Sequence, residues 1–152
     1  MRKKNHLAIF IGLLLFAVEV VRAQTDTLTF QPKRGIVAKI TISGQEVVYA
    51  AIKGHSKNVG QLTVETENPL RVHVADYNFD GYDDFAVSHV ADGMGTYMYY
   101  YIYKYSPRAN KFYAMKPPCS YEFINVVLDP KSRTLSNSYF ANNVLLTCKK
   151  KY

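Results

Sequence analysis

Short apolar runs separated by turn-forming residues follow one another along the chain after residue 23. Ile36–Ile42 and Gln45–Ile52 flank Ser43-Gly44, a pattern typical of a β-hairpin with a two-residue turn. The polar stretch 53–60 predicts a loop, and no stretch shows the apolar period of a helix. Further strands are predicted at residues 61–65, 70–75, 85–90, 97–105, 111–115, 122–128, 133–139 and 144–148. The pattern predicts one all-β domain of about ten short antiparallel strands, arranged as a hairpin array, a sandwich or a propeller-like fold.

One of these strands carries tyrosine at every second position. Tyr97, Tyr99, Tyr101, Tyr103 and Tyr105 would share one face, because successive side chains of a strand point to opposite faces. Tyrosine favours strands and its ring packs well across neighbouring strands, so we expect this stripe to serve sheet packing. An exposed stripe would instead offer a platform on which sugar rings could stack.

The first 23 residues have the pattern of a secretory signal peptide. A basic start, Met1–His6, precedes the uncharged apolar run Leu7–Val18, and compact residues follow at Val21 and Ala23, where a cleavage site needs them. The apolar run is short for a membrane span, which takes about 20 residues, so a retained N-terminal anchor is the weaker alternative. We expect residues 1–23 to be removed and residues 24–152 to form one domain in the periplasm or outside the cell.

The expected mature domain carries a modest positive charge. The whole chain has a net charge of +7, of which Arg2, Lys3, Lys4, Arg22 and Glu19 account for +3, and this leaves +4 for the domain. Such a charge suits an acidic partner or an anionic cell-wall polymer, and it gives no indication of nucleic acid. The basic residues 149–151 are expected to form a solvated tail.

Cys119 and Cys148 are the two cysteines of the chain, and both lie in the part that we expect to be exported. In an oxidising compartment, two cysteines predict one disulfide. The bond would close a loop of about 30 residues and stabilise the fold by roughly 3–4 kcal/mol in the chain-entropy model. Two buried free thiols are the alternative.

The stretch Asp76–Asp84 reads D-Y-N-F-D-G-Y-D-D and has the donor pattern of a calcium loop. Calcium takes about 6–8 oxygen ligands. The candidate ligands are the side chains of Asp76, Asn78, Asp80 and Asp84 and the main-chain carbonyl of Tyr82. Gly81 permits the sharp turn that brings the last of these back to the ion. A metal-free turn is the alternative, because Asp, Asn and Gly favour turns in any case.

The loop differs from an EF-hand, which needs a glutamate where Val87 stands and helices where strands are predicted. It resembles the FG-GAP class of calcium loops, found in integrin-type β-propellers and in many exported bacterial proteins. The similarity continues through Y-K-Y-S-P at residues 103–107, K-F-Y at 111–113 and V-V-L-D-P-K-S-R-T-L at 126–135. Over roughly residues 70–140, the chain resembles a family of small periplasmic bacterial proteins that includes lysozyme inhibitors and immunity proteins against lysozyme-like toxins. The resemblance implies an all-β, calcium-stabilised scaffold whose loops enter an enzyme cleft.

The sequence contains no recognisable catalytic motif of the serine-hydrolase, zinc-protease or phosphate-loop kinds. We therefore expect a non-catalytic inhibitor or immunity protein that blocks a lysozyme-like, peptidoglycan-cleaving enzyme. Two loops carry the candidate partner-binding residues, which are Tyr139, Phe140 and Asn142 in Ser136–Asn143 and Met94 and Thr96 in Ala91–Thr96. The second loop follows the calcium hairpin and is expected to be held by it.

The alternative function is a cell-wall glycan-binding or adhesion module with an FG-GAP-type calcium site. That function would require the tyrosine stripe to be exposed. Each candidate partner-binding residue could also belong to an ordinary hairpin turn, since Asn, Ser and Gly are common in turns.

Overall fold

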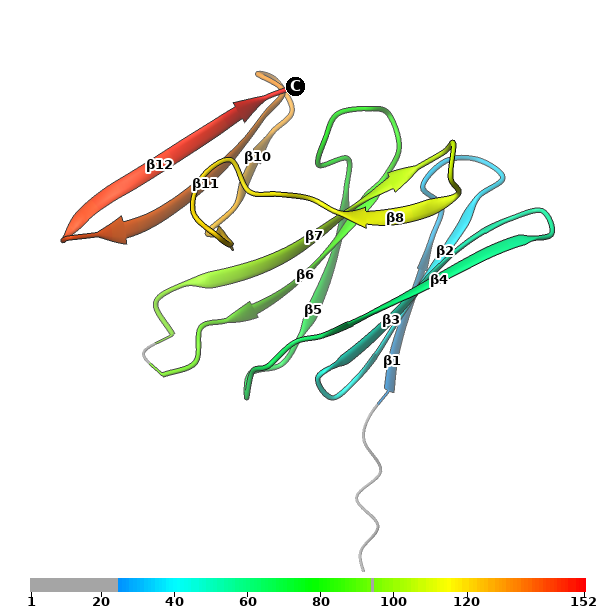
Figure 1. Cartoon of the computed structure of the whole chain (residues 1–152), viewed down its shortest axis with the longest axis horizontal. Helices are drawn as coiled ribbons and strands as arrows, with labels where there is room; N and C mark the ends of the chain where they lie inside the picture. The colour runs from blue at the N-terminus through cyan, green and yellow to red at the C-terminus, as the bar shows by residue number, and fades with distance from the viewer. Residues whose placement is uncertain (1–24, 94) are drawn as a thin grey trace, which may run out of the picture.

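Three antiparallel β-sheets make up the fold (Figure 1). The computed structural model describes residues 25–93 and 95–152, and the regular elements in these ranges are all strands. The first sheet has the order β1 (Thr25–Phe30), β2 (Val37–Ser43), β3 (Glu46–Lys53) and β4 (Ser56–Thr63). The central sheet has the order β5 (Arg71–Ala75), β6 (Asp84–Val90), β7 (Met98–Ser106) and β8 (Lys111–Ala114), and β9 (Phe123–Ile124) also pairs with β7. The third sheet has the order β10 (Val127–Asp129), β11 (Thr134–Ala141) and β12 (Val144–Lys151).

This architecture confirms the prediction of a single all-β domain built from antiparallel strands. The described residues form twelve strands, where about ten were expected from the turn signals. Within the described ranges, no helix is long and apolar enough to cross a membrane. The predicted signal peptide, residues 1–23, lies outside the described residues.

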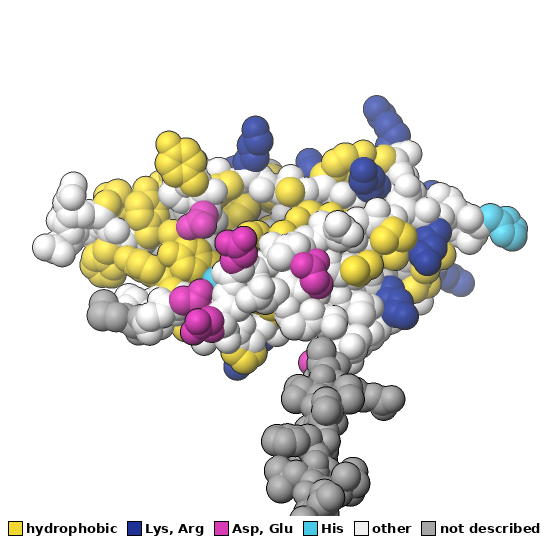
Figure 2. Space-filling model, turned by 60° about the horizontal axis from the view of Figure 1, so that its bottom comes forward, with side chains coloured by type: hydrophobic (Ala, Val, Ile, Leu, Met, Phe, Trp, Pro, Cys, Tyr) yellow, Lys and Arg dark blue, Asp and Glu magenta, His cyan; other side chains and the backbone are white. Residues whose placement is uncertain are grey.

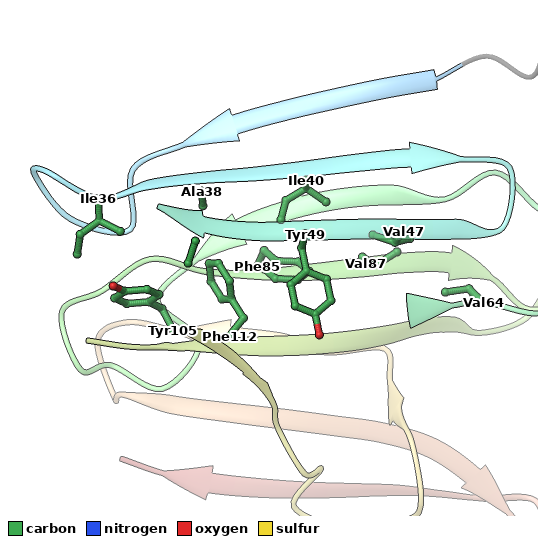
Figure 3. Packing of buried hydrophobic residues seen from close by; sticks show 11 residues of the cluster. Ile36, Ala38, Ile40, Val47, Tyr49, Val64, Phe85, Val87, Tyr105 and Phe112 are labelled. Carbon is green, nitrogen blue, oxygen red and sulfur yellow. The ribbon is translucent and has the colours of Figure 1, made fainter. Parts of the chain in front are cut away.

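The first and central sheets pack face to face over the larger core (Figure 3). Strand β2 alternates exposed and buried residues, and it buries Ala38 and Ile40 because successive side chains point to opposite faces. From the central sheet, Phe85 stacks on Tyr103 with ring centroids 5.1 Å apart. Phe112 packs edge-on against Phe85 at 4.9 Å. Burial of these apolar surfaces is the main force that holds the two sheets together.

The opposite face of the central sheet packs on the third sheet. Ala86 and Ile102 project from this face and join Leu135 of β11 in a second buried cluster, together with Tyr77 and Phe123. Strand β6 is therefore covered on both faces along nearly its whole length. Because β6 lies at the centre of a three-layered molecule, the loops at its two ends are well placed to contact the other sheets.

A glycine in β4 makes room for a core ring. Gly60 is paired directly with Tyr49 of β3. A Cβ atom at Gly60 would lie 2.4 Å from the Tyr49 ring, which is closer than real carbon atoms approach. The ring lies over this position and packs on Tyr103 at 4.9 Å, so glycine is required here for steric reasons.

The first sheet has two edge strands that the sequence prediction missed in whole or in part. Residues 56–60, predicted as a loop, belong to β4, because the chain reverses in a tight turn at Gly54, where φ is 56°. Strand β1 was not predicted, and nearly all of its residues are exposed. Edge strands tolerate exposed polar side chains, so neither has the apolar alternation that marks a strand covered by a core.

Two further differences lie near the C-terminus. The predicted strand 122–128 is interrupted at Asn125, where φ is 46° and the backbone N–H donates to the Met98 carbonyl at 2.9 Å. The basic residues 149–151 are part of β12 and pair with β11, so the expectation of a solvated tail is wrong. Their side chains are nevertheless exposed, as the charge requires.

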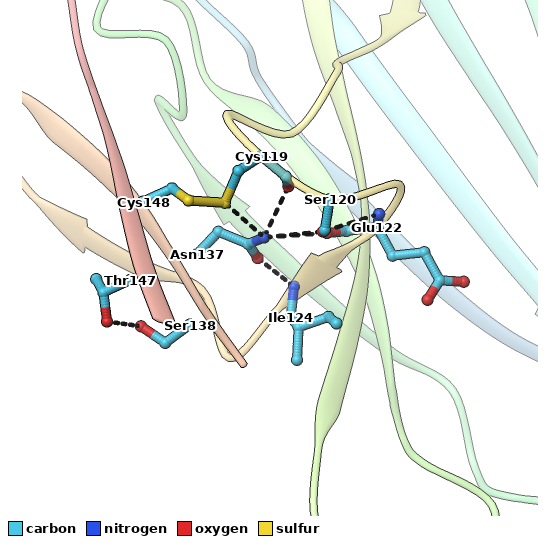
Figure 4. Close-up of a disulfide and its surroundings, with 8 residues drawn as sticks. All are labelled: Cys119, Ser120, Glu122, Ile124, Asn137, Ser138, Thr147 and Cys148. Atoms are coloured by element: carbon cyan, nitrogen blue, oxygen red, sulfur yellow. Dashed lines mark hydrogen bonds between the residues drawn. A yellow bond between two sulfur atoms is a disulfide. The ribbon is translucent and has the colours of Figure 1, made fainter. Parts of the chain in front are cut away.

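The predicted disulfide between Cys119 and Cys148 is confirmed, and it ties the loop before β9 to β12 (Figure 4). A fully buried amide, Asn137 of β11, supports the same loop. Its Nδ2 donates to the carbonyl oxygens of Cys119 and Glu122, both at 3.1 Å, and its Oδ1 accepts from the N–H of Ile124. Because the amide is hydrogen-bonded, its burial is not penalised and the loop backbone is held against β11.

Candidate calcium loop and binding surface

The predicted calcium ligands lie in the tight connection between β5 and β6. The Asp76 carboxylate accepts hydrogen bonds from the N–H groups of Asp80 at 3.0 Å and Gly81 at 2.7 Å. The Asp80 carboxylate accepts from the N–H of Tyr82 at 3.0 Å and from Nδ2 of Asn78 at 2.8 Å. Gly81 has a φ of 84°, a left-handed conformation that glycine adopts without strain. The local sequence thus curls the loop around its own carboxylates.

Asp84 lies at the base of this loop and is fully buried. Its two oxygens accept hydrogen bonds from the backbone N–H groups of Tyr77 at 3.0 Å and Tyr105 at 2.8 Å. Burial raises the pKa of the Asp84 carboxyl to about 7; the Tyr105 bond opposes this, and the carboxylates of Asp80 and Asp76 add to it. A buried carboxylate close to two others is costly when ionised, and a bound cation would relieve that cost.

The loop contacts the other two sheets as well as its own. The N–H of Asp83 donates to the carbonyl oxygen of Pro32, in the connection between β1 and β2, at 2.9 Å. On the other side, Nη2 of Arg133, in the connection between β10 and β11, donates to the Phe79 carbonyl at 2.8 Å. An ordered loop therefore links all three layers of the fold.

The donor chemistry of the loop fits calcium. The candidate ligands all offer oxygen, the donor that this hard cation prefers, and each carboxylate keeps lone pairs beyond those in its hydrogen bonds. In the described part of the chain, no three acidic, histidine or cysteine side chains converge closely enough to hold a metal ion as they stand. The carboxylates of the loop accept hydrogen bonds from within the loop, so calcium would have to replace some of these bonds.

Those predicted partner-binding residues that the structure describes gather in a second region, far from this loop. We call it the hairpin end; it comprises the described residues of the β6–β7 connection, 91–93 and 95–97, and the tip of the β11–β12 hairpin, Tyr139–Leu146 (Figure 1). The hydroxyl of Tyr97 accepts a hydrogen bond from the N–H of Phe140 at 3.2 Å. Two loops that are far apart in the sequence therefore form one surface.

The hairpin tip is a tight turn with exposed side chains. Asn142 and Asn143 have φ values of 52° and 62°, and a type I′ turn requires positive φ at both of its central positions. The turn is shorter than predicted, because Phe140 still belongs to β11. Phe140 is 56% exposed, Asn142 is exposed, and Tyr139 is half-buried opposite Leu146.

Asp92 holds the β6–β7 connection in place. Its Oδ1 accepts hydrogen bonds from Oγ1 of Thr66 and Nδ2 of Asn68, both at 2.9 Å. These residues directly precede β5, the first strand of the calcium hairpin, whereas the calcium loop itself lies at the other end of β6, roughly 20 Å away at the rise of a strand. Of the two predicted residues here, Thr96 is exposed and Met94 lies outside the described residues.

The tyrosine stripe of β7 is divided between the core and the surface. Tyr105 is buried and Tyr103 packs in the larger core, where burial raises the pKa of Tyr103 to about 12. These two rings serve sheet packing, as expected. Tyr97, Tyr99 and Tyr101, toward the hairpin end, are half-buried.

Two exposed apolar groups were missed by the sequence reasoning. Tyr121, in the connection between β8 and β9, is completely exposed. Val144 and Leu145 at the start of β12 are each more than half exposed. The signal for Tyr121 was available, since it stands in a segment with two prolines and Cys119, which a disulfide fixes. The start of β12 carries no such signal, because Val and Leu are typical of a buried strand.

Charge is unevenly distributed over the molecule. Figure 2 shows apolar side chains gathered toward the hairpin end with acidic side chains along their border, whereas most Lys and Arg side chains in this view lie toward the other end. Burial raises the pKa of Tyr101, and the nearby carboxylates of Glu122 and Glu65 raise it further. The positive net charge of the chain therefore does not describe the hairpin end, where Asp92 is the one charged residue among those that the structure describes.

No family model, curated protein or solved structure matches the chain.

Proposed function

We propose that residues 24–152 form an exported, non-catalytic inhibitor or immunity protein that blocks a lysozyme-like, peptidoglycan-cleaving enzyme. The observation that supports this most directly is the Tyr97–Phe140 hydrogen bond, which joins two separately predicted loops into one projecting surface. The resemblance of Asp76–Asp84 and the segments after it to periplasmic lysozyme inhibitors points the same way.

The hairpin tip has the chemistry that a plug for an enzyme cleft needs. Lysozyme-like enzymes cleave glycan with a pair of carboxylic side chains in a cleft. The exposed Phe140 ring offers an aromatic anchor of the kind that dominates tight interfaces. The neighbouring Asn142 and Asn143 offer side-chain N–H donors to the carboxylates of the enzyme. Because β11 and β12 form a narrow ribbon, these side chains reach outward together.

The tip is held in place before any partner binds. The disulfide through Cys148 anchors β12, and the Tyr97 hydroxyl anchors the backbone at Phe140. A surface that is already ordered loses less conformational entropy on binding than a flexible loop does. The fold thus supports tight binding by a small contact area.

Calcium stabilises the scaffold in this proposal and makes no contact with the enzyme. The side chains of Asp76, Asn78, Asp80 and Asp84 and the carbonyl of Tyr82 would hold the ion. Its charge would offset the repulsion around the buried Asp84 carboxylate, and the loop would then fix all three sheets. The disulfide supports an oxidising location, either the periplasm or the cell exterior.

A turnover assay tests the proposal. The mature domain is titrated into muramidases acting on cell-wall substrate, and we expect saturable inhibition at a one-to-one ratio. Phe140→Ala should weaken inhibition by about tenfold or more, the effect of truncating an interface anchor. Val59→Ala, an equally exposed apolar residue on the first sheet, is the matched control. Absence of inhibition of every muramidase encoded beside the gene or met by the host would end the proposal.

A cell-wall glycan-binding or adhesion module is the second candidate function. The half-buried rings of Tyr97, Tyr99 and Tyr101 favour it, since sugar rings stack on aromatic surface that solvent can reach. Retention of the domain on insoluble peptidoglycan, lost in Tyr99→Ala and unaccompanied by enzyme inhibition, would support this candidate in place of the inhibitor.

A further inference from the structure

A pocket of about 120 Å³ opens at the edge of the central sheet. It lies where β8 ends at Ala114 and before β9 begins at Phe123, so that β7 lacks a neighbouring strand between them. Pro117 and Pro118 occupy this interval and have no N–H to donate, so the segment cannot continue the pairing with β7. The pocket is therefore a consequence of the sequence at this edge.

Aromatic rings form much of the pocket wall. Tyr99, Tyr101 and Tyr103 line it from β7, and Tyr121 lines it from the β8–β9 connection. The His89 ring stacks on Tyr99 at 5.5 Å and on Tyr101 at 6.1 Å, which holds both tyrosine rings in place. Tyr121 is completely exposed and stands at the rim. The pocket thus combines rings packed on His89 with one fully exposed ring.

The charge of the pocket is negative. Among the residues that line it, Glu122 alone carries a charge at neutral pH. Glu122 lines the same pocket as Tyr99 and Tyr101. Burial raises the pKa of each of these two tyrosines, and the Glu122 carboxylate raises it further. The Glu122 backbone is bound to Asn137, while its side chain points away from Asn137 and the disulfide (Figure 4). The carboxylate is therefore positioned by a rigid backbone and remains accessible.

Aromatic faces beside a carboxylate are the chemistry that recognises an organic cation. We infer that this pocket takes a lysine or arginine side chain from a basic partner protein, as a second contact beside the hairpin tip. The inference rests on the proposed function, because it describes the surface of the same partner. The volume of about 120 Å³ suits one side chain, whereas an oligosaccharide needs a longer groove with several hydrogen-bonding groups. The Glu122 carboxylate would repel an anionic side chain, and a neutral side chain would gain no attraction from it.

Peptide titrations followed by the NMR signals of the tyrosine rings test this inference on the whole mature domain. The probes are short capped peptides that differ only at one position, which is arginine, lysine or the uncharged norleucine, and a chito-oligosaccharide. We expect the arginine and lysine peptides to shift the Tyr99 and Tyr101 signals. The norleucine peptide should bind about tenfold more weakly, because it lacks the cation.

Two variants locate the binding site, each with a matched control. Glu122→Gln and Tyr121→Ala should each lower the affinity for the arginine peptide by about three- to thirtyfold. Glu46→Gln and Tyr113→Ala, which change exposed residues outside the pocket, should leave binding unchanged. All four side chains are exposed, so we expect all four variants to fold as the wild type does.

Equal affinities for the norleucine and arginine peptides, or an unchanged affinity in Glu122→Gln, would overturn the inference. Selective binding of the chito-oligosaccharide would overturn it too and would assign the pocket to glycan. Either result would leave enzyme inhibition by the hairpin tip intact. A bound arginine peptide without any inhibited muramidase would support the pocket and count against the proposed function instead.

Discussion

Replacing Asp84 by asparagine should change how the stability of the metal-free domain depends on pH. Asp84 is fully buried, and burial raises the pKa of its carboxyl from its ordinary value of 3.8 to about 7 in the folded protein. A carboxyl whose pKa is higher in the folded state favours folding when protonated. Its contribution is fully present below about pH 4 and is lost as the pH rises through about 7. This difference between the pKa values of Asp84 in the two states corresponds to about 4 kcal/mol in the free energy of unfolding.

Urea unfolding in the presence of a chelator, at a series of pH values, measures this effect. Between about pH 4 and about pH 8, the free energy of unfolding should fall by about 4 kcal/mol more in the wild type than in Asp84→Asn. The asparagine keeps an acceptor for only one of the two N–H groups of Tyr77 and Tyr105, so the variant should be less stable by about 1–3 kcal/mol at low pH. Calcium should restore the stability of the wild type above about pH 7, because the ionised Asp84 carboxylate can then bind the ion. The same pH dependence in both proteins would refute the reasoning about this buried carboxyl.

Three further predictions concern stability. Calcium should raise the melting temperature over that in chelator, and Asp80→Ala should lose most of this shift; an unchanged melting temperature with no metal in the purified protein would sink the calcium site. Replacing Cys119 and Cys148 by serine should cost about 3.6 kcal/mol for a separation of 29 residues, measured by urea unfolding, and a negligible loss would contradict the chain-entropy estimate. Gly60→Ala should cost about 1–3 kcal/mol in the same assay, because the new Cβ meets the Tyr49 ring, and wild-type stability would show that the ring moves freely.

Local patterns predicted those parts of the fold that depend on neighbouring residues. The β2–β3 hairpin follows from alternation on both sides of Gly44, and its turn has the positive φ of 59° that glycine permits. The disulfide was predicted from the cysteine count and the expected compartment. Strand β4 was partly missed, because a polar edge strand has no core to impose alternation. The stacking of three sheets depends on contacts between distant segments, which local periodicity does not encode.

The candidate surface also combines features that local sequence predicts with features that depend on contacts between distant segments. The residues of the two loops were identified from their composition, but the hydrogen bond from Phe140 to Tyr97 joins positions 43 residues apart and became visible only in the fold. The pocket beside Glu122 was not predicted, because it arises from a gap between two strands that pair with β7. Exposure of Tyr121 also depends on the loop that the disulfide and Asn137 hold.

Amide hydrogen exchange of the mature domain, alone and bound to a muramidase that it inhibits, tests most directly that the hairpin end is the binding surface. We predict slower exchange in the β6–β7 connection and at the β11–β12 tip, around Thr96 and Asn142, with no change in the first sheet. Exchange that slows in β1–β4 and stays unchanged at the hairpin end would contradict this account.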